Sequence, residues 1–326
     1  MNPGSMKLVA PAIILEQIAA QIPSDCRANM TIVGSLAVGY HFFGTDRAQM
    51  MRTKDADCLI SPRLRAVVAG TAITERLFEE HWRFRATEEW PAPGDDSTPE
   101  ANLPAVRLNP PDSSDWFVEL LTVPETSAQR GLQFLRIETA FGHFGLPSFG
   151  FIGLATFEST QTPFGIYVAH PTMMALANLL EHQVVTGIRA PFGDRQIKRA
   201  NKDLGRVLAI ARLSIGIDED ALVSWPAHWS RALRDQFPTE WHEHASGVGI
   251  GIRQLLDSPE DLEEAQFTCE FGLLASKPPS VEQLRLVGLR LLQDAVEPLE
   301  KLARVQVNAG PTGEVQVAVA EPKRPA

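Results

Sequence analysis

The chain has 326 residues, of which 44% are hydrophobic and 21% charged, and its formal net charge is -10. This length and composition are those of an ordinary globular protein and exclude a fibrous or wholly disordered chain. The negative charge argues against a protein that coats nucleic acid by bulk attraction, so a phosphate-bearing partner would have to meet a local cluster of cations. Three widely spaced cysteines without a Cys-x-x-Cys pair indicate neither a disulfide framework nor a cysteine zinc site. No stretch approaches the roughly 18 apolar residues of a membrane span, so we expect a cytoplasmic protein with reduced thiols that does not contact membranes.

The first half of the chain carries the signals of a small mixed sheet with flanking helices. Short runs rich in β-branched and aromatic residues predict strands, and apolar residues at three- and four-residue spacings predict helices. Pro, Gly, Asp and Ser gathered at 91–104 predict an exposed loop. The expected elements are a helix at 11–22, a strand at 30–33, a helix at 36–43, a strand at 55–60, a helix at 64–81, and strands at 105–108, 116–123, 148–157 and 165–169.

The second half is predicted to be helical from Pro171, a residue suited to a first helical turn. Later helices are expected at 194–213, 219–236, 239–257, 259–276 and 280–304. The sequence therefore predicts an α+β fold with a sheet domain at 1–169, an α-helical domain at 170–305 and a flexible tail at 306–326. The glycines at 247, 249 and 251 lack the preceding strand of a dinucleotide site, so we expect a loop or helix junction there.

Gly34 and Ser35 stand where a predicted strand turns into a predicted helix. A helix start offers free backbone N–H groups and the positive end of the helix dipole, which together favour a phosphate. Glycine allows close approach of the backbone, and a serine hydroxyl can donate to a phosphoryl oxygen. This turn is therefore a candidate phosphate-binding site.

Carboxylates follow on the next strands. Asp55 and Asp57, two residues apart on a strand, point to the same face of the sheet. Glu119 lies within an apolar run, where a carboxylate is costly to bury without a metal or a charged partner. Mg²⁺ prefers carboxylate and phosphate oxygens, so Asp55, Asp57 and Glu119 are candidate metal ligands. Two alternatives stay open: Asp115 could be the third acid, and Glu119 could be an outward-facing strand residue paired with an arginine.

A basic stripe is predicted on the helix that starts near residue 194. Between 189 and 212 there are seven Lys or Arg residues against two Asp, unlike the acidic chain as a whole. Lys198 or Lys202 is the expected phosphate clamp, and a solvated helix surface is the alternative. The stripe consists of Arg195, Lys198, Arg199, Lys202 and Arg206.

The chain carries, in this order, a Gly34-Ser35 turn, a helix, Asp55-Ala56-Asp57 and an apolar strand with Glu119. With this order of segments the sequence resembles the nucleotidyltransferase superfamily that includes DNA polymerase β and the AbiEii-type toxins. The resemblance covers about residues 30–123. It implies that the Gly34-Ser35 turn grips a triphosphate, that the two aspartates bind metal and that Glu119 helps to activate an acceptor hydroxyl. Lys202-Asp203 is similar to the helical region of AbiEii-type toxins, where a lysine contacts the nucleotide.

The resemblance implies an enzyme that uses Mg²⁺ or Mn²⁺ to move a nucleoside monophosphate from an NTP to a hydroxyl acceptor, with release of pyrophosphate. Its acceptor would be tRNA, a protein or a small molecule, and its partner an antitoxin. The interval from Ser35 to Asp55 is longer than the family usually shows. This favours the alternative of a catalytically degenerate module that binds nucleotides or protein partners.

Overall fold

The computed structural model describes residues 8–126, 129, 131–185 and 187–309. Its centre is a mixed seven-stranded sheet with the strand order β10-β11-β2-β4-β7-β6-β5. The pairs β4–β7 and β11–β2 are parallel, and the other neighbours are antiparallel. The strands are β2 (Met30–Val33), β4 (Asp55–Ile60), β5 (Arg83–Phe84), β6 (Arg107–Asn109), β7 (Phe117–Thr122), β10 (Thr160–Gln161) and β11 (Tyr167–Val168).

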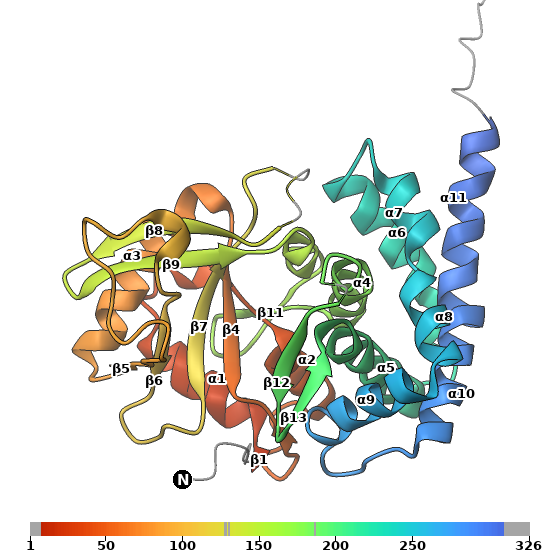
Figure 1. The fold of residues 1–326 in the computed structure, drawn as a ribbon, viewed down its shortest axis with the longest axis horizontal. Coiled ribbons are helices and arrows are strands. Elements are labelled where there is room, and N and C mark those ends of the chain that lie inside the picture. The colour runs from red at the N-terminus through yellow and green to blue at the C-terminus, as the bar shows by residue number, and fades with distance from the viewer. Residues whose placement is uncertain (1–7, 127–128, 130, 186, 310–326) are drawn as a thin grey trace, which may run out of the picture.

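Helices and three small two-stranded sheets surround this central sheet (Figure 1). The helices of the first half are α1 (Pro11–Gln21), α2 (Gly34–Phe43) and α3 (Arg63–Glu79), with short 3-10 turns at Arg27–Asn29, Glu100–Asn102 and Ile152–Thr156. The two-stranded sheets pair β1 (Leu8–Val9) with β3 (Met51–Arg52), β8 (Gln133–Thr139) with β9 (Gly142–Ser148), and β12 (Arg189–Phe192) with β13 (Arg195–Lys198).

The C-terminal region is mostly helical and lies to one side of the sheet, with the β12–β13 hairpin between them (Figure 1). One continuous cluster of buried apolar side chains runs through both halves of the chain, from Ile14 to Ala303. The helices are α4 (Pro171–Glu181), α5 (Arg199–Ile217), α6 (Trp225–Gln236), α7 (Trp241–Gly247), α8 (Ile250–Asp257), α9 (Pro259–Glu270), α10 (Val281–Leu291) and α11 (Glu297–Ala309), with a 3-10 turn at Ala221–Ser224 and a π-helical turn at Leu292–Val296.

The predicted α+β class is confirmed in its main features, a mixed sheet followed by a mostly helical region. The junction at the glycines 247–251 is also confirmed, because α7 ends and α8 begins there. The expected tail from residue 306 falls mostly outside the described residues, since α11 continues to Ala309 and 310–326 are not described.

One predicted helix begins later than expected, and one predicted strand is wrong. The helix expected at 194–213 is present as α5, but residues 194–198 belong to the β12–β13 hairpin, because Gly193 turns the chain with a φ of +62°. Residues 148–157 do not form a strand, because β9 ends at Ser148 and the apolar run that follows is buried by the 3-10 turn Ile152–Thr156. A short apolar run cannot distinguish a strand from a buried helical turn.

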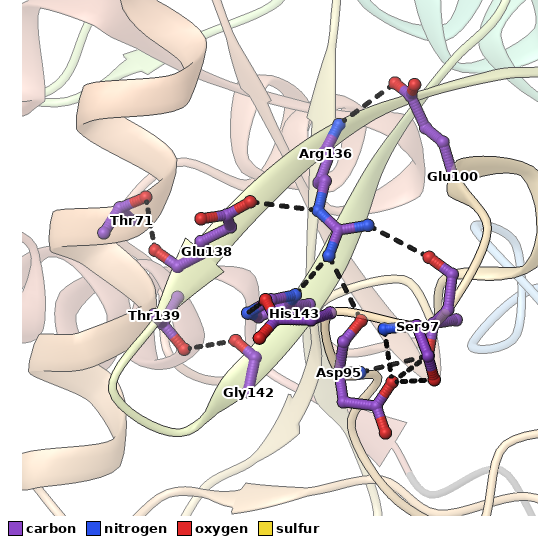
Figure 2. Close-up of polar contacts among 11 residues, drawn as sticks. Thr71, Asp95, Ser97, Glu100, Arg136, Glu138, Thr139, Gly142 and His143 are labelled. Carbon is purple, nitrogen blue, oxygen red and sulfur yellow. Dashed lines mark hydrogen bonds and ion pairs between the residues drawn. The ribbon is translucent and has the colours of Figure 1, made fainter.

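The loop at 91–104, expected to be exposed, is tied to the β8–β9 hairpin by Arg136 of β8 (Figure 2). Its guanidinium donates to the backbone oxygens of Asp95 and Thr98 at 3.1 and 3.0 Å and contacts the His143 ring. The backbone N–H of Arg136 donates to the Glu100 carboxylate at 3.3 Å. The loop is thus held by hydrogen bonds, although many of its side chains are exposed.

Candidate functional site

The turn from β2 into α2 is built around a close backbone approach. Gly34 is buried and has a φ of +69°, a left-handed conformation that L side chains rarely adopt. A Cβ placed on Gly34 would lie 2.5 Å from the Asp57 Oδ2 atom. Only glycine therefore allows the helix start to sit directly against the Asp57 carboxylate.

The three candidate carboxylates are neighbours on parallel strands. Asp57 of β4 lies beside Glu119 of β7 in the strand register, and Asp55 is two residues before it. All three line one cavity of about 420 Å³. The Asp55 Oδ1 atom accepts a hydrogen bond of 3.0 Å from the Thr53 hydroxyl. The alternation expected of residues 55–60 thus places both aspartates at the same cavity.

Asp57 lies in the middle of this charge cluster. Burial raises its pKa well above the ordinary range, the nearby carboxylates of Asp55 and Glu119 raise it further, and Arg206 and Lys202 oppose the shift. Within the described part of the chain, no donor hydrogen-bonds the Asp57 carboxylate. A cation placed here would favour its ionised form.

Glu119 is held by an arginine. Arg107 of β6 donates to the Glu119 Oε1 atom from both Nε and Nη2, at 3.0 and 2.9 Å. The Glu119 side chain is 12% exposed, and burial raises its pKa despite this pairing. The structure therefore shows the arginine partner of the alternative, but Glu119 is buried at the cavity and does not face outward. Asp115 is exposed, accepts a hydrogen bond from the Ser113 hydroxyl at 3.3 Å and lines neither this cavity nor the smaller one beside it.

The cavity lies between the central sheet, the β8–β9 hairpin, α4, α5 and the β12–β13 hairpin, whose arrangement can be followed in Figure 1. Its charged lining consists of the three carboxylates with Arg107, Lys202 and Arg206, and of Glu181, Arg199 and Asp203. Its other lining residues are mainly apolar. The apolar and aromatic lining includes Trp90, Leu121, Leu132, Phe134, Pro147, Phe149, Phe151, Ile152, Met174 and Phe192.

The basic stripe is divided by the hairpin. Arg199, Lys202 and Arg206 of α5 line the same cavity as the carboxylates. Lys198 ends β13, and its ammonium donates to the Asp261 carboxylate at 2.7 Å. It lines neither cavity, so it does not join the candidate site.

The residues that sequence analysis missed are Arg107 and two cations before the aspartates, Arg52 and Lys54. Arg107 and Glu119 are cross-strand neighbours of opposite charge, but their pairing depends on the β6–β7 register. Arg52 and Lys54 line a second cavity together with Ser35 and Asp55. The signal that could have identified Arg52 and Lys54 is their nearness to Asp55 in the sequence.

The side chains fit a two-carboxylate metal site better than a three-carboxylate one. Among the described residues, no group of three or more His, Cys, Asp and Glu is arranged to hold a metal ion. Asp55 and Asp57 still offer two carboxylates on one strand face, and Mg²⁺ is commonly bound through one or two carboxylates together with substrate phosphates.

Comparisons with protein-family models, with curated proteins and with solved structures find no match to this chain. Of the helices in the described ranges, none has the length and apolar character needed to cross a membrane.

Proposed function

We propose that this protein is a nucleotidyltransferase that uses Mg²⁺ or Mn²⁺ to move a nucleoside monophosphate from an NTP to a hydroxyl acceptor, with release of pyrophosphate. The proposal is supported above all by one observation, the close approach of Gly34 to the Asp57 carboxylate, where an added Cβ would lie 2.5 Å from Oδ2. It joins a helix start suited to phosphate with a carboxylate suited to metal, beside Lys202 and Arg206.

Each group has a role that its position supports. Ser35 and the start of α2 offer donors to phosphoryl oxygens, and Lys202 and Arg206 supply positive charge. Asp55 and Asp57 would hold the metal ion, which supplies charge neutralisation for the triphosphate when bound. Arg107 occupies Oε1 of Glu119, which leaves Oε2 as the oxygen that would take the acceptor's proton.

The acceptor class stays open within this proposal and includes tRNA, a protein and a small molecule. An antitoxin partner belongs to the same proposal. The apolar walls of the larger cavity offer space for the nucleoside or for the acceptor.

A catalytically degenerate module that binds nucleotides or a protein partner is the second candidate. It is favoured by the pairing of Glu119 with Arg107 and by the lack of a three-ligand metal cluster among the described residues. This module would bind an NTP in the same cavity without turnover.

The experiment that separates the two is incubation with each α-labelled NTP, Mg²⁺ and total cell extract, followed by separation of RNA, protein and small molecules. Label that moves to one fraction with wild type but not with the Asp55→Ala/Asp57→Ala variant supports the enzyme and identifies its acceptor class. NTP binding without transfer in any fraction would support the module instead.

A further inference from the structure

A second cavity of about 200 Å³ adjoins the first at Asp55. Asp55 lines both cavities, whereas Asp57 lines only the larger one. On the neighbouring strand β7, Phe117 lines the smaller cavity and Glu119 the larger. The two cavities therefore follow one another along these strands, with Asp55 at their junction.

The smaller cavity has an excess of positive charge. Four cationic side chains line it, and Asp55 is the one carboxylate among the described residues that do so. No ion pair joins any of these cations to a carboxylate in the described part of the chain, whereas Lys198 and Arg107 are both paired. In a chain with a net charge of -10, such a cluster favours a multiply charged anion. The cations are Arg52, Lys54, Lys202 and Arg206.

Aromatic rings lie against two of these cations, and a third, Arg206, donates from its guanidinium to the Asn178 side-chain oxygen at 3.3 Å. The Arg52 guanidinium lies over the Phe271 ring at 5.1 Å from its centroid, and the Lys202 ammonium lies 5.6 Å from the Phe192 centroid. The backbone N–H of Arg52 donates to the Gly272 oxygen at 3.1 Å, which fixes β3 against the loop after α9. Contacts with ring faces leave the N–H groups of Arg52 and Lys202 available to donate to an anion.

The order of the two cavities along the strands also indicates which cavity would take the leaving group and which the acceptor. In phosphoryl transfer the attacking and leaving oxygens lie roughly in line on opposite sides of the phosphorus. With the reacting phosphorus near Asp55, a leaving group in the basic cavity would place the acceptor in the larger one. Ser35 lines the basic cavity and adds a neutral donor on that side.

We propose that the smaller cavity binds the diphosphate end of the NTP, and that it binds free inorganic pyrophosphate on its own through Arg52 and Lys54. The delivery of this group by an NTP rests on the proposed function. The binding of free pyrophosphate does not require any transfer, so the two are separable.

The test is isothermal titration of inorganic pyrophosphate into the full chain at fixed ionic strength, with and without Mg²⁺. The Arg52→Gln/Lys54→Gln variant should bind at least about tenfold more weakly than wild type, because two charge-assisted contacts are lost. Arg47→Gln is the matched control, since Arg47 is exposed and pairs with Glu16 away from the cavity. It should bind like wild type.

A charge-preserving variant, Arg52→Lys/Lys54→Arg, keeps the test valid where the glutamine variant unfolds, and it should retain binding. Equal affinity in wild type and the glutamine variant, or no pyrophosphate binding by wild type, would overturn the inference. Pyrophosphate binding and label transfer are both measured on the same protein. Binding that depends on Arg52 and Lys54 supports the inference even where no transfer occurs. Transfer without pyrophosphate binding would overturn it and leave the enzyme proposal standing.

Discussion

Replacement of Gly34 by alanine should damage both the stability and the ligand binding of this protein. Its φ of +69° costs an L residue about 1–2 kcal/mol. The new Cβ would also meet the Asp57 Oδ2 atom at 2.5 Å, so the carboxylate would have to move. Forced movement in a packed site typically costs about 1–3 kcal/mol more.

Gly165→Ala is the matched control. Gly165 also has a positive φ, +80°, but its added Cβ would meet Arg27 at an ordinary distance of 3.7 Å. Gly165→Ala should therefore lower the free energy of unfolding only by the backbone penalty of about 1–2 kcal/mol. Denaturant unfolding of both variants gives the difference, which measures the contact with Asp57.

The contact itself is isolated by repeating Gly34→Ala in an Asp57→Ala background. Without the carboxylate, the cost of Gly34→Ala should fall to that of Gly165→Ala, a coupling of about 1–3 kcal/mol. NTP binding should weaken in Gly34→Ala and stay unchanged in Gly165→Ala. An equal cost of Gly34→Ala in both backgrounds would refute the close approach between turn and carboxylate.

Three further changes should give the following results. Glu119→Gln should lower the free energy of unfolding by about 1–3 kcal/mol in urea titrations, because it weakens a largely buried charge-assisted pair; no loss would mean that the pair does not form. Burial, and next the neighbouring imidazoles, lower the pKa of His170 from 6.5 to about 4. The unfolded chain therefore takes up this proton first as pH falls, and the free energy of unfolding should drop by at most ~3 kcal/mol between about pH 6.5 and 4. His170→Asn should flatten that drop, and an unchanged slope in the variant would count against a role of His170. Gly251→Ala should destabilise by about 1–3 kcal/mol without altering NTP binding, because its Cβ would overlap the buried His182 ring. Gly247→Ala, with its nearest atom at 3.6 Å, should be mild.

Local patterns were sufficient for part of this site. The strand at 30–33, the turn at Gly34 and the strand at 55–60 have the predicted positions, because each depends on short-range alternation and on turn chemistry. The same alternation put Asp55 and Asp57 on one face, and both line the cavity.

Long-range pairing was beyond the sequence. The register that sets Glu119 beside Asp57 and opposite Arg107 joins segments far apart in the chain, and no local pattern fixes it. Lys198 was placed on a helix because lysines and arginines recur at helical spacing there, but a glycine turn at 193 makes the segment a hairpin. That turn directs Lys198 to Asp261 and leaves Lys202 at the cavity.

Nucleotidyl transfer at Asp57 is tested most directly by the rate of pyrophosphate release from NTP. The assay contains Mg²⁺ and the acceptor fraction that label transfer has identified. Asp57→Asn should slow release at least about a hundredfold, because it removes a carboxylate from the charge cluster that would hold the metal. Asp115→Asn, an exposed carboxylate outside both cavities, should release pyrophosphate at the wild-type rate. Equal rates in wild type and Asp57→Asn would contradict the account.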